Sequence, residues 1–166
     1  MTAQRQERNA WRRGIALIGL LAAVVLGSAA MAQAATTERV VVNRHTGLAI
    51  GGFDPVAYFT DHEARLGDVQ FEASASGAVW RFSNSGNRSF FLARPDIYAP
   101  QFGGYDPVDV ARGVAVAGNS LLWLVIGQRL YLFGREQNRD AFAANPEQFL
   151  QDAGQRWPEL LSTLAE

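Results

Sequence analysis

Two pairs of similar segments recur along the sequence at almost the same spacing. GGFDPVAYF begins at Gly51 and GGYDPVDVA begins at Gly103, 52 positions later. A longer pair, VWRFSNSGNRSFFLARPDIY and LYLFGREQNRDAFAANPEQF, begins at Val79 and Leu130, 51 positions apart. Two separate motifs at nearly one spacing indicate an internal duplication. Because two copies are too few for an open solenoid, we expect them to pair into one compact domain with a shared core.

Residues 51–100 (the first half) and 103–152 (the second half) carry the same local signals. In each, Gly-Gly leads to Asp-Pro, which predicts a short helix with Asp as the N-cap and Pro at the first helical position. A hairpin follows, closed by Ser-Gly or Gly-Gln, and then a helix that ends before a proline. The predicted fold is α+β, a compact domain of two duplicated hairpin-plus-helix units. The predicted strands are 69–75, 78–82, 121–126 and 129–133, the predicted helices after them are 86–93 and 136–144, and Phe90, Phe91 and Phe142 are expected to face the core.

The N-terminal segment has the three parts of a secretory signal. It begins with a basic stretch, continues with an apolar run from Ile15 to Leu26, and ends in the small-residue site Ala32-Gln33-Ala34. We expect cleavage after Ala34, with cleavage after Ala32 and an uncleaved anchor as alternatives, and therefore a periplasmic or secreted protein. The adjacent pair Arg12-Arg13 leaves both the Sec and the twin-arginine route open. The predicted organisation is a signal peptide at 1–34, an N-terminal extension at 35–46, the duplicated domain at 47–153 and a C-terminal helical tail at 154–166.

The composition limits the partners that the protein can have. The formal net charge of -1 provides no basic field for nucleic acid. The chain has no Cys, so disulfides, a Cys nucleophile and a thiolate-bound metal are excluded. Contact with a membrane is expected only through the signal segment. A small ligand, a divalent metal ion or a protein partner remain open.

The repeated phrases resemble those of the YHS domain family. The resemblance is carried by GGFDPVAYF at 51–59 and by FSNSGNRSFFLARPDIYAPQFGGY at 82–105, and it extends over about residues 47–153. It implies a small α+β unit that is sometimes grouped with metal-binding treble-clef relatives. Members of the family often carry Cys directly after Gly-Gly-Tyr, where this chain has Asp106, so the resemblance does not extend to a thiolate metal site.

Three residues are candidate metal ligands. Asp54 and Asp106 occupy matching places in the two halves, and His62 lies in the polar stretch Thr-Asp-His-Glu. The alternative is that both aspartates are helix caps, which needs nothing beyond their own helices. In that case Asn or Ser would serve almost as well at either position. His62 and His45, the only histidines, are expected on solvated loops.

Two further groups of residues are interpreted as structural. The pairs Asn87-Arg88 and Asn138-Arg139 recur at the starts of the matched helices, where Arg could hold an anion or, more commonly, bind a carbonyl or an acid. An aromatic set is expected to belong to the core, and it comprises Tyr58, Trp80, Tyr98, Tyr105, Trp123 and Tyr131.

No catalytic motif is present in the sequence. G-x-S-x-G, H-E-x-x-H, a P-loop and a G-x-G-x-x-G that opens a helix are all missing, and we predict no catalytic residue. The first hypothesis is an exported, non-catalytic YHS-type module that binds a small ligand, a metal ion or a protein partner. The alternatives are a metal-dependent or carboxylate-based enzyme that uses the region of Asp54 and Asp106, and a structural or assembly factor.

Overall fold

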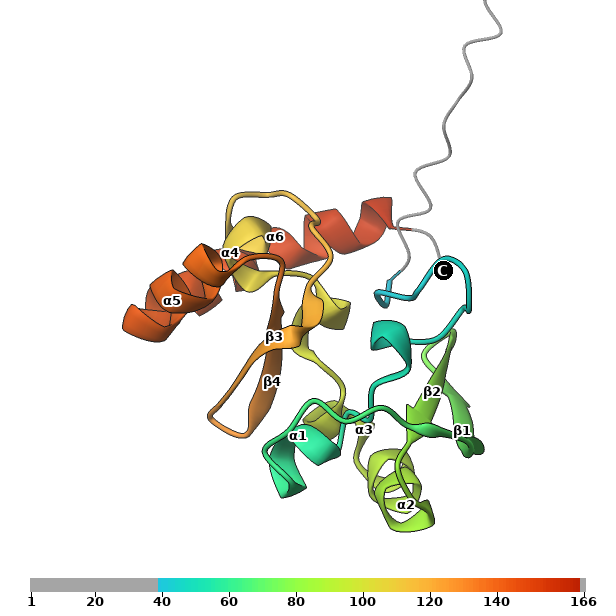
Figure 1. The fold of residues 1–166 in the computed structure, drawn as a ribbon. Helices are drawn as coiled ribbons and strands as arrows, with labels where there is room; N and C mark the ends of the chain where they lie inside the picture. Colours follow the sequence, from blue (N-terminus) through green and yellow to red (C-terminus); the bar gives the residue numbers. More distant parts are fainter. Residues whose placement is uncertain (1–38, 165–166) are drawn as a thin grey trace, which may run out of the picture. The chain divides into compact units, whose positions relative to one another are not determined.

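The computed structural model describes residues 39–164 and combines short helices with two two-stranded antiparallel sheets, which is compatible with the α+β class (Figure 1). One sheet pairs β1 with β2 and the other pairs β3 with β4. The predicted signal segment, its cleavage site and the first part of the predicted extension lie outside the described residues. In chain order the elements are η1 (Ile50–Gly52), α1 (Ala57–Thr60), β1 (Asp68–Ala75), β2 (Ala78–Phe82), α2 (Ser85–Ala93), α3 (Pro95–Tyr98), η2 (Gln101–Gly104), α4 (Pro107–Ala111), β3 (Asn119–Ile126), β4 (Arg129–Phe133), α5 (Glu136–Ala144) and α6 (Pro146–Thr163).

Both hairpins close with two-residue turns in which each residue has a positive φ. The angles are 52° and 77° at Ser76 and Gly77, and 58° and 57° at Gly127 and Gln128. Two left-handed residues in a row match the right-handed twist of the flanking strands, which is why such turns join tight hairpins. The strands are as predicted, except that β1 begins one residue earlier and β3 two residues earlier than expected.

The two hairpins also share an irregularity in their pairing. The register shifts between Asp68 and Glu72 in the first hairpin and between Asn119 and Trp123 in the second, at positions 51 residues apart. In both, the shift lies in the first half of the longer strand, where it bends the strand and increases its local twist.

The helices that follow the hairpins end at the positions that their prolines dictate. Both α2 and α5 stop at Ala, and the next residues, Arg94 and Asn145, leave the helical region with φ near −145°. The residue before a proline is sterically excluded from the helical region, so each helix must end there.

Matched aromatic rings have similar surroundings in the two halves. Phe82 packs on Phe91 with ring centroids 5.2 Å apart, and Phe133 packs on Phe142 at 5.3 Å. All four rings are buried. Phe90, however, is 55% exposed, contrary to the expectation that it faces the core. Adjacent residues of a helix point about 100° apart, so only one of Phe90 and Phe91 can face the sheet.

The interior is built jointly by the two halves. Leu130 and Leu132 of β4 belong to the same buried cluster as Trp80 and Phe82 of β2. Tyr58 of α1 crosses in the other direction, and its ring packs edge-on against Trp123 of β3 at 5.2 Å. The shared core that the sequence analysis expected is therefore present.

The hydroxyl groups of two buried residues form hydrogen bonds between the halves. Tyr58 donates its hydroxyl proton to the backbone oxygen of Ser120 at 2.9 Å. The hydroxyl of Ser120 then donates to the backbone oxygen of Ile50 at 2.7 Å. These bonds satisfy polar groups that burial would otherwise leave unpaired.

The ends of the described chain are part of the domain rather than appendages. Val42 forms an isolated bridge with Ala49, and Val41 N–H donates to the backbone oxygen of Gly103. The last helix, α6, runs without a break across residue 154, where the sequence analysis placed a boundary. It passes through Pro158, whose missing N–H leaves the carbonyl of Gly154 without its helical partner. Because Gly154 is exposed, solvent can take that place.

The apolar face of α6 explains why the helix continues. It covers α4 through a cluster that contains Tyr105, Val110, Ala153, Trp157 and Leu164. Packing of an amphipathic face supplies most of a helix's stability in a protein and outweighs one unfavourable residue. None of the helices within residues 39–164 has the length and apolarity that crossing a lipid bilayer requires.

Candidate functional site: two buried aspartates

Asp54 is fully buried at the point where the chain turns into α1. Its Oδ1 accepts hydrogen bonds from the backbone N–H groups of Val56 at 2.9 Å and Ala57 at 3.4 Å. Asp54 thus accepts backbone bonds as a capping side chain would, but the N-cap residue of α1 is Val56 and not Asp54 as predicted. The helix begins at Ala57, however, and not at Pro55 as expected, because Pro55 and Val56 are used in the turn that the Asp54 side chain closes.

The second carboxylate oxygen of Asp54 reaches across to the junction between β2 and α2. Oδ2 accepts from the backbone N–H of Ser83 at 2.8 Å, from the Ser83 hydroxyl at 2.7 Å and from Nδ2 of Asn87 at 2.7 Å. Asp54 thus accepts five hydrogen bonds in all. It joins the start of α1 to the start of α2, 28 residues further along the chain.

Asp106 has the same arrangement in the second half. It is fully buried and is the N-cap of α4, where Oδ1 accepts from Val108 N–H at 2.9 Å. Oδ2 accepts from Gly134 N–H at 2.8 Å and from Nδ2 of Asn138 at 2.8 Å. Gly134 takes the place that Ser83 has in the first half, so the backbone bond is kept and the hydroxyl bond is lost.

A third carboxylate makes the second half different from the first. Asp109, which is 4% exposed, takes the place of Ala57 and accepts from Nδ2 of Asn138 at 3.0 Å. Arg135 binds both of its oxygens, at 2.6 and 2.8 Å, and Arg112 binds Oδ1 at 3.0 Å. A buried carboxylate is tolerated where cations and hydrogen bonds compensate for its lost hydration, and the two guanidinium groups do so here.

The two halves also begin their second helices differently. Asn84 caps α2 by accepting from Asn87 N–H at 2.8 Å. Arg135 stands in the matching place before α5 and makes no capping bond, because a guanidinium has no acceptor for a backbone N–H. Its side chain binds Asp109 instead. The sequence analysis missed Asp109, Ser83 and Arg135. The available signal was that Asp109 and Arg135, an acid and a base, stand in the second half at the positions that Ala57 and Asn84 occupy in the first.

Tyr58 is the most perturbed titratable group near these networks. Burial raises the pKa of its hydroxyl well above the ordinary value, and the side chain of Ser120 lowers it by less. The negative charge of Asp54 also raises that pKa. Burial raises the pKa of Tyr131 as well, against the opposing effect of Arg129. Tyr58 therefore remains a neutral hydrogen-bond donor at physiological pH.

The candidate histidine lies apart from the aspartates. His62 and His45 are both exposed, and the acids beside His62 are engaged with Arg65, whose guanidinium lies 3.2 Å from both Asp61 and Glu63. Within residues 39–164, no three side chains of the metal-ligating types His, Cys, Asp and Glu are grouped so that they could hold one ion. The structure does not bring His62 together with Asp54 and Asp106 as one ligand set.

The recurring Asn-Arg pairs divide into two roles. The asparagines, Asn87 and Asn138, are buried and hold the carboxylates, a role that the sequence analysis did not assign to them. Arg139 lies at the surface and binds the neighbouring acid, Asp140, at 2.9 Å, in line with the expectation that such arginines bind acids.

In comparisons with known proteins, no family model, curated protein or solved structure matches the chain.

Proposed function

We propose that the chain is an exported, non-catalytic binding module built from two copies of a YHS-like unit. In this proposal the buried aspartates are scaffold rather than active site. Each holds the turn before its first helix and the start of its second helix in a fixed relation, and binding takes place elsewhere on the domain.

The observation that carries the proposal is the hydrogen bonding of the carboxylates. An ionised carboxylate has about four lone-pair positions, and Asp54 accepts five bonds from donors of its own chain. Asp106 accepts three. A metal ion or a substrate would have to displace buried N–H donors, each at a cost of about 1–3 kcal/mol. Groups held in this way are poorly suited to ligation or to proton transfer.

The proposed duplication is supported by matched geometry rather than by sequence spacing alone. The strands, the register shifts, the packed phenylalanine pairs and the Asp-to-Asn bonds all recur at offsets of 51 or 52 residues. The resemblance to the YHS family rests on the same repeated phrases.

Metal analysis of the exported protein tests the proposal. The protein is purified without chelators, its metal content is measured, and its melting temperature is followed with copper, zinc, iron and nickel ions. We expect no stoichiometric metal and no ion-specific stabilisation. Asp61→Asn, which alters an exposed acid, serves as the control for weak surface binding.

The opposite result would be one equivalent of metal whose X-ray absorption spectrum shows carboxylate oxygen ligands. That spectrum is recorded on the parent protein, so the test does not depend on a variant that must fold. Metal that is lost from Asp106→Ala and kept in Asp61→Asn would point to the same conclusion. Either result would replace the scaffold proposal with a metal-dependent function at the aspartates.

A further inference from the structure

The two hairpins differ in what covers the sheet face that points away from the following helix. In the second hairpin this face meets the first half, and Leu130 and Leu132 of β4 point from it into the joint core. Tyr131 and Phe133, which alternate with them along the strand, pack instead on Phe142 of α5. One face of the second hairpin therefore serves its own helix, and the other serves the first half.

The matching face of the first hairpin is more exposed to solvent. Positions in the two hairpins match at a spacing of 51, and Asp68 and Asn119 illustrate this, since each accepts from the backbone N–H two residues further on. In the second half all the residues of this face are buried or packed against the core. In the first half Val69 is 65% exposed, and Ser74 is exposed as well. The face, called the open face below, consists of Val69, Glu72, Ser74, Val79 and Arg81, which match Ser120, Trp123, Val125, Leu130 and Leu132.

The open face carries one acid and one base. Nε of Arg81 lies 2.7 Å from Oε1 of Glu72, and the two side chains are 31% and 35% exposed. They stand where the second hairpin has Leu132 and Trp123, so the open face is more polar than its buried counterpart. Such a mixed face is compatible with water in a free protomer and with an interface in a complex, because non-obligate interfaces are about as apolar as the rest of a protein surface.

Two exposed apolar side chains accompany the ion pair. Val69 lies at the start of β1, and Leu66, three residues earlier in the chain, is 64% exposed. Single exposed apolar residues are common on proteins. Two of them next to a charged pair provide the apolar part that the centre of an interface requires.

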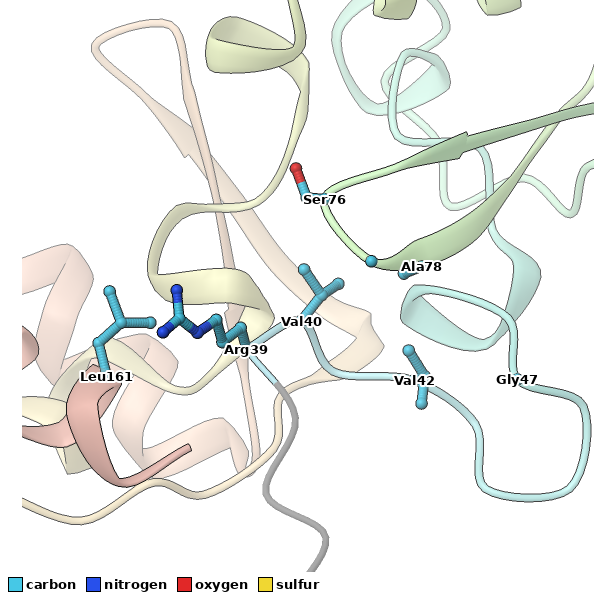
Figure 2. A pocket seen from close by; sticks show the side chains of 8 residues that line it. Arg39, Val40, Val42, Gly47, Ser76, Ala78 and Leu161 are labelled. Carbon is cyan, nitrogen blue, oxygen red and sulfur yellow. The ribbon is translucent and has the colours of Figure 1, made fainter. Parts of the chain in front are cut away.

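The tip and the edge of the hairpin are less suited to binding than the face. At the tip, Ser76 and Ala78 lie with Val40 around a pocket of about 670 Å³ (Figure 2). Along the edge, the register shift between Asp68 and Glu72 interrupts the regular pairing of β1. A bulged edge strand resists pairing with a further strand. Contact through the hairpin is therefore expected at the open face.

We propose that the open face binds the open face of a second copy of the chain in a dimer with twofold symmetry. The matching face of the second hairpin is covered by a unit of the same kind, including Tyr58 of α1, so the fold already uses this surface to join two units. The charges identify the same occupant. A twofold axis brings Glu72 of one protomer toward the partner's Arg81, so a face with one acid and one base is complementary to itself.

Sedimentation velocity of the exported protein from about 1 μM to about 1 mM tests the dimer. We expect a monomer–dimer equilibrium in which Val69→Asp weakens association at least about tenfold, because the substitution places an unpaired charge in the interface. Leu121→Asp is the matched control, since Leu121 is a 63% exposed residue of β3, and it should leave association unchanged. A parent that is monomeric at every concentration, or equal association of the two variants, would overturn the proposal.

Charge reversals test the symmetry of the contact. Glu72→Arg and Arg81→Glu each leave two like charges on the open face, so each variant alone should lose self-association. An equimolar mixture of the two should form a heterodimer, because the faces are again complementary and because only folded protomers can associate in this way. The same reversals at the exposed pair Arg139 and Asp140 are the control and should leave the dimer intact.

Unchanged self-association of either single variant, or a mixture that does not associate, would contradict the twofold contact. The dimer and the role proposed for the aspartates are independent of each other. A monomeric parent would leave the scaffold role of the aspartates standing, and stoichiometric metal on carboxylate ligands would overturn that role whatever the sedimentation shows.

Discussion

Nδ2 of Asn138 lies 2.8 Å from Oδ2 of Asp106 and 3.0 Å from Oδ2 of Asp109, so that one amide group holds two buried carboxylates. In the first half Nδ2 of Asn87 is shared between Asp54 at 2.7 Å and the hydroxyl of Ser83 at 3.2 Å. In the second half this amide therefore donates to two carboxylates. In the first half it donates to one carboxylate and to one neutral hydroxyl.

Replacing this amide in the second half should destabilise the protein more than replacing it in the first half. Asn138→Leu removes a donor from two buried carboxylates, whereas Asn87→Leu leaves Asp54 with four other donors. We expect Asn138→Leu to cost about 1–3 kcal/mol for each acceptor left unpaired, and Asn87→Leu to cost less. Urea unfolding measures both values, with the exposed Gln151→Leu as the control. Equal costs at the two positions would show that Asp109 is held without Asn138.

The stability of Asp106→Asn distinguishes two roles for Asp106: a helix cap alone, or a cap that also holds the junction between β4 and α5. At a simple cap, Asn would cost little, because its oxygen accepts the same bond from Val108 N–H. In the structure the second oxygen also accepts, from Gly134 N–H and Asn138 Nδ2, and an amide would turn its own N–H₂ group toward two donors. We therefore expect Asp106→Asn to lose roughly 1–3 kcal/mol of unfolding free energy.

A chemical or thermal melt of the Asp106 variants gives the answer. Asp106→Ser, which keeps an acceptor for Val108 and removes the second oxygen, is the companion variant. If Asp106→Asn were as stable as the parent within error, Asp106 would act as a helix cap alone. Each melt is repeated with divalent ions, so that stabilisation by a bound metal is measured separately from the effect of the substitution.

The differences between the halves predict a compensating pair of substitutions. Arg135→Asn installs the residue that caps α2 in the first half, but it leaves Asp109 with only Asn138 and Arg112. We expect this single change to cost roughly 1–3 kcal/mol, since Arg112 remains and Arg135 is itself half exposed. Adding Asp109→Ala, the residue of the first half, should recover most of the loss.

A double-mutant cycle in urea measures that recovery. The four proteins are the parent, Arg135→Asn, Asp109→Ala and the double variant. Additive costs would mean that Asp109 and Arg135 act independently, contrary to the geometry. The exposed pair Arg139 and Asp140 provides a control cycle with a small expected coupling.

Tyr58 should make the protein sensitive to alkaline pH. Its pKa is raised in the folded state, so the folded protein holds a proton that the unfolded chain releases near pH 10. The stability that this provides is complete below that pH and is lost as the pH rises above it. Tyr58→Phe loses the bond to Ser120, at about 0.5–1.5 kcal/mol near neutrality, but should show a shallower decline from pH 9.5 to pH 11.5.

Unfolding free energies across that pH range are the measurement. Some decline should remain in Tyr58→Phe, because the pKa of Tyr131 is raised as well. Tyr98→Phe, at a half-buried ring, controls for the loss of any one phenol. Parallel curves for the parent and Tyr58→Phe would show that Tyr58 ionises in the folded protein as it does in the unfolded chain.

The sequence predicted the elements whose signals are local. The hairpin turns at Ser76 and Gly127, and the helix ends before Pro95 and Pro146, follow from the steric preferences of two or three adjacent residues. The capping bond of Asp106 is local too, because donor and acceptor are two residues apart.

The parts that could not be predicted depend on contacts between distant residues. Asp109 meets Arg135 across 26 positions, and nothing next to either residue indicates the pairing. The outward orientation of Phe90 depends on which side of α2 meets the sheet, a choice made by its packing. The length of α6 likewise follows from the surface of α4 that it covers, which outweighs Pro158.

The joint interior of the two halves has a consequence for how the protein comes apart. Each hairpin is a separate sheet, and two separate sheets could be thought to melt in two steps. Leu130 and Leu132 of the second hairpin, however, lie in the same buried cluster as Trp80 and Phe82 of the first. Opening either hairpin therefore removes part of the other's core. Cooperativity extends across the whole domain, and a fragment that ends between the halves would lack the surface on which its own folding depends.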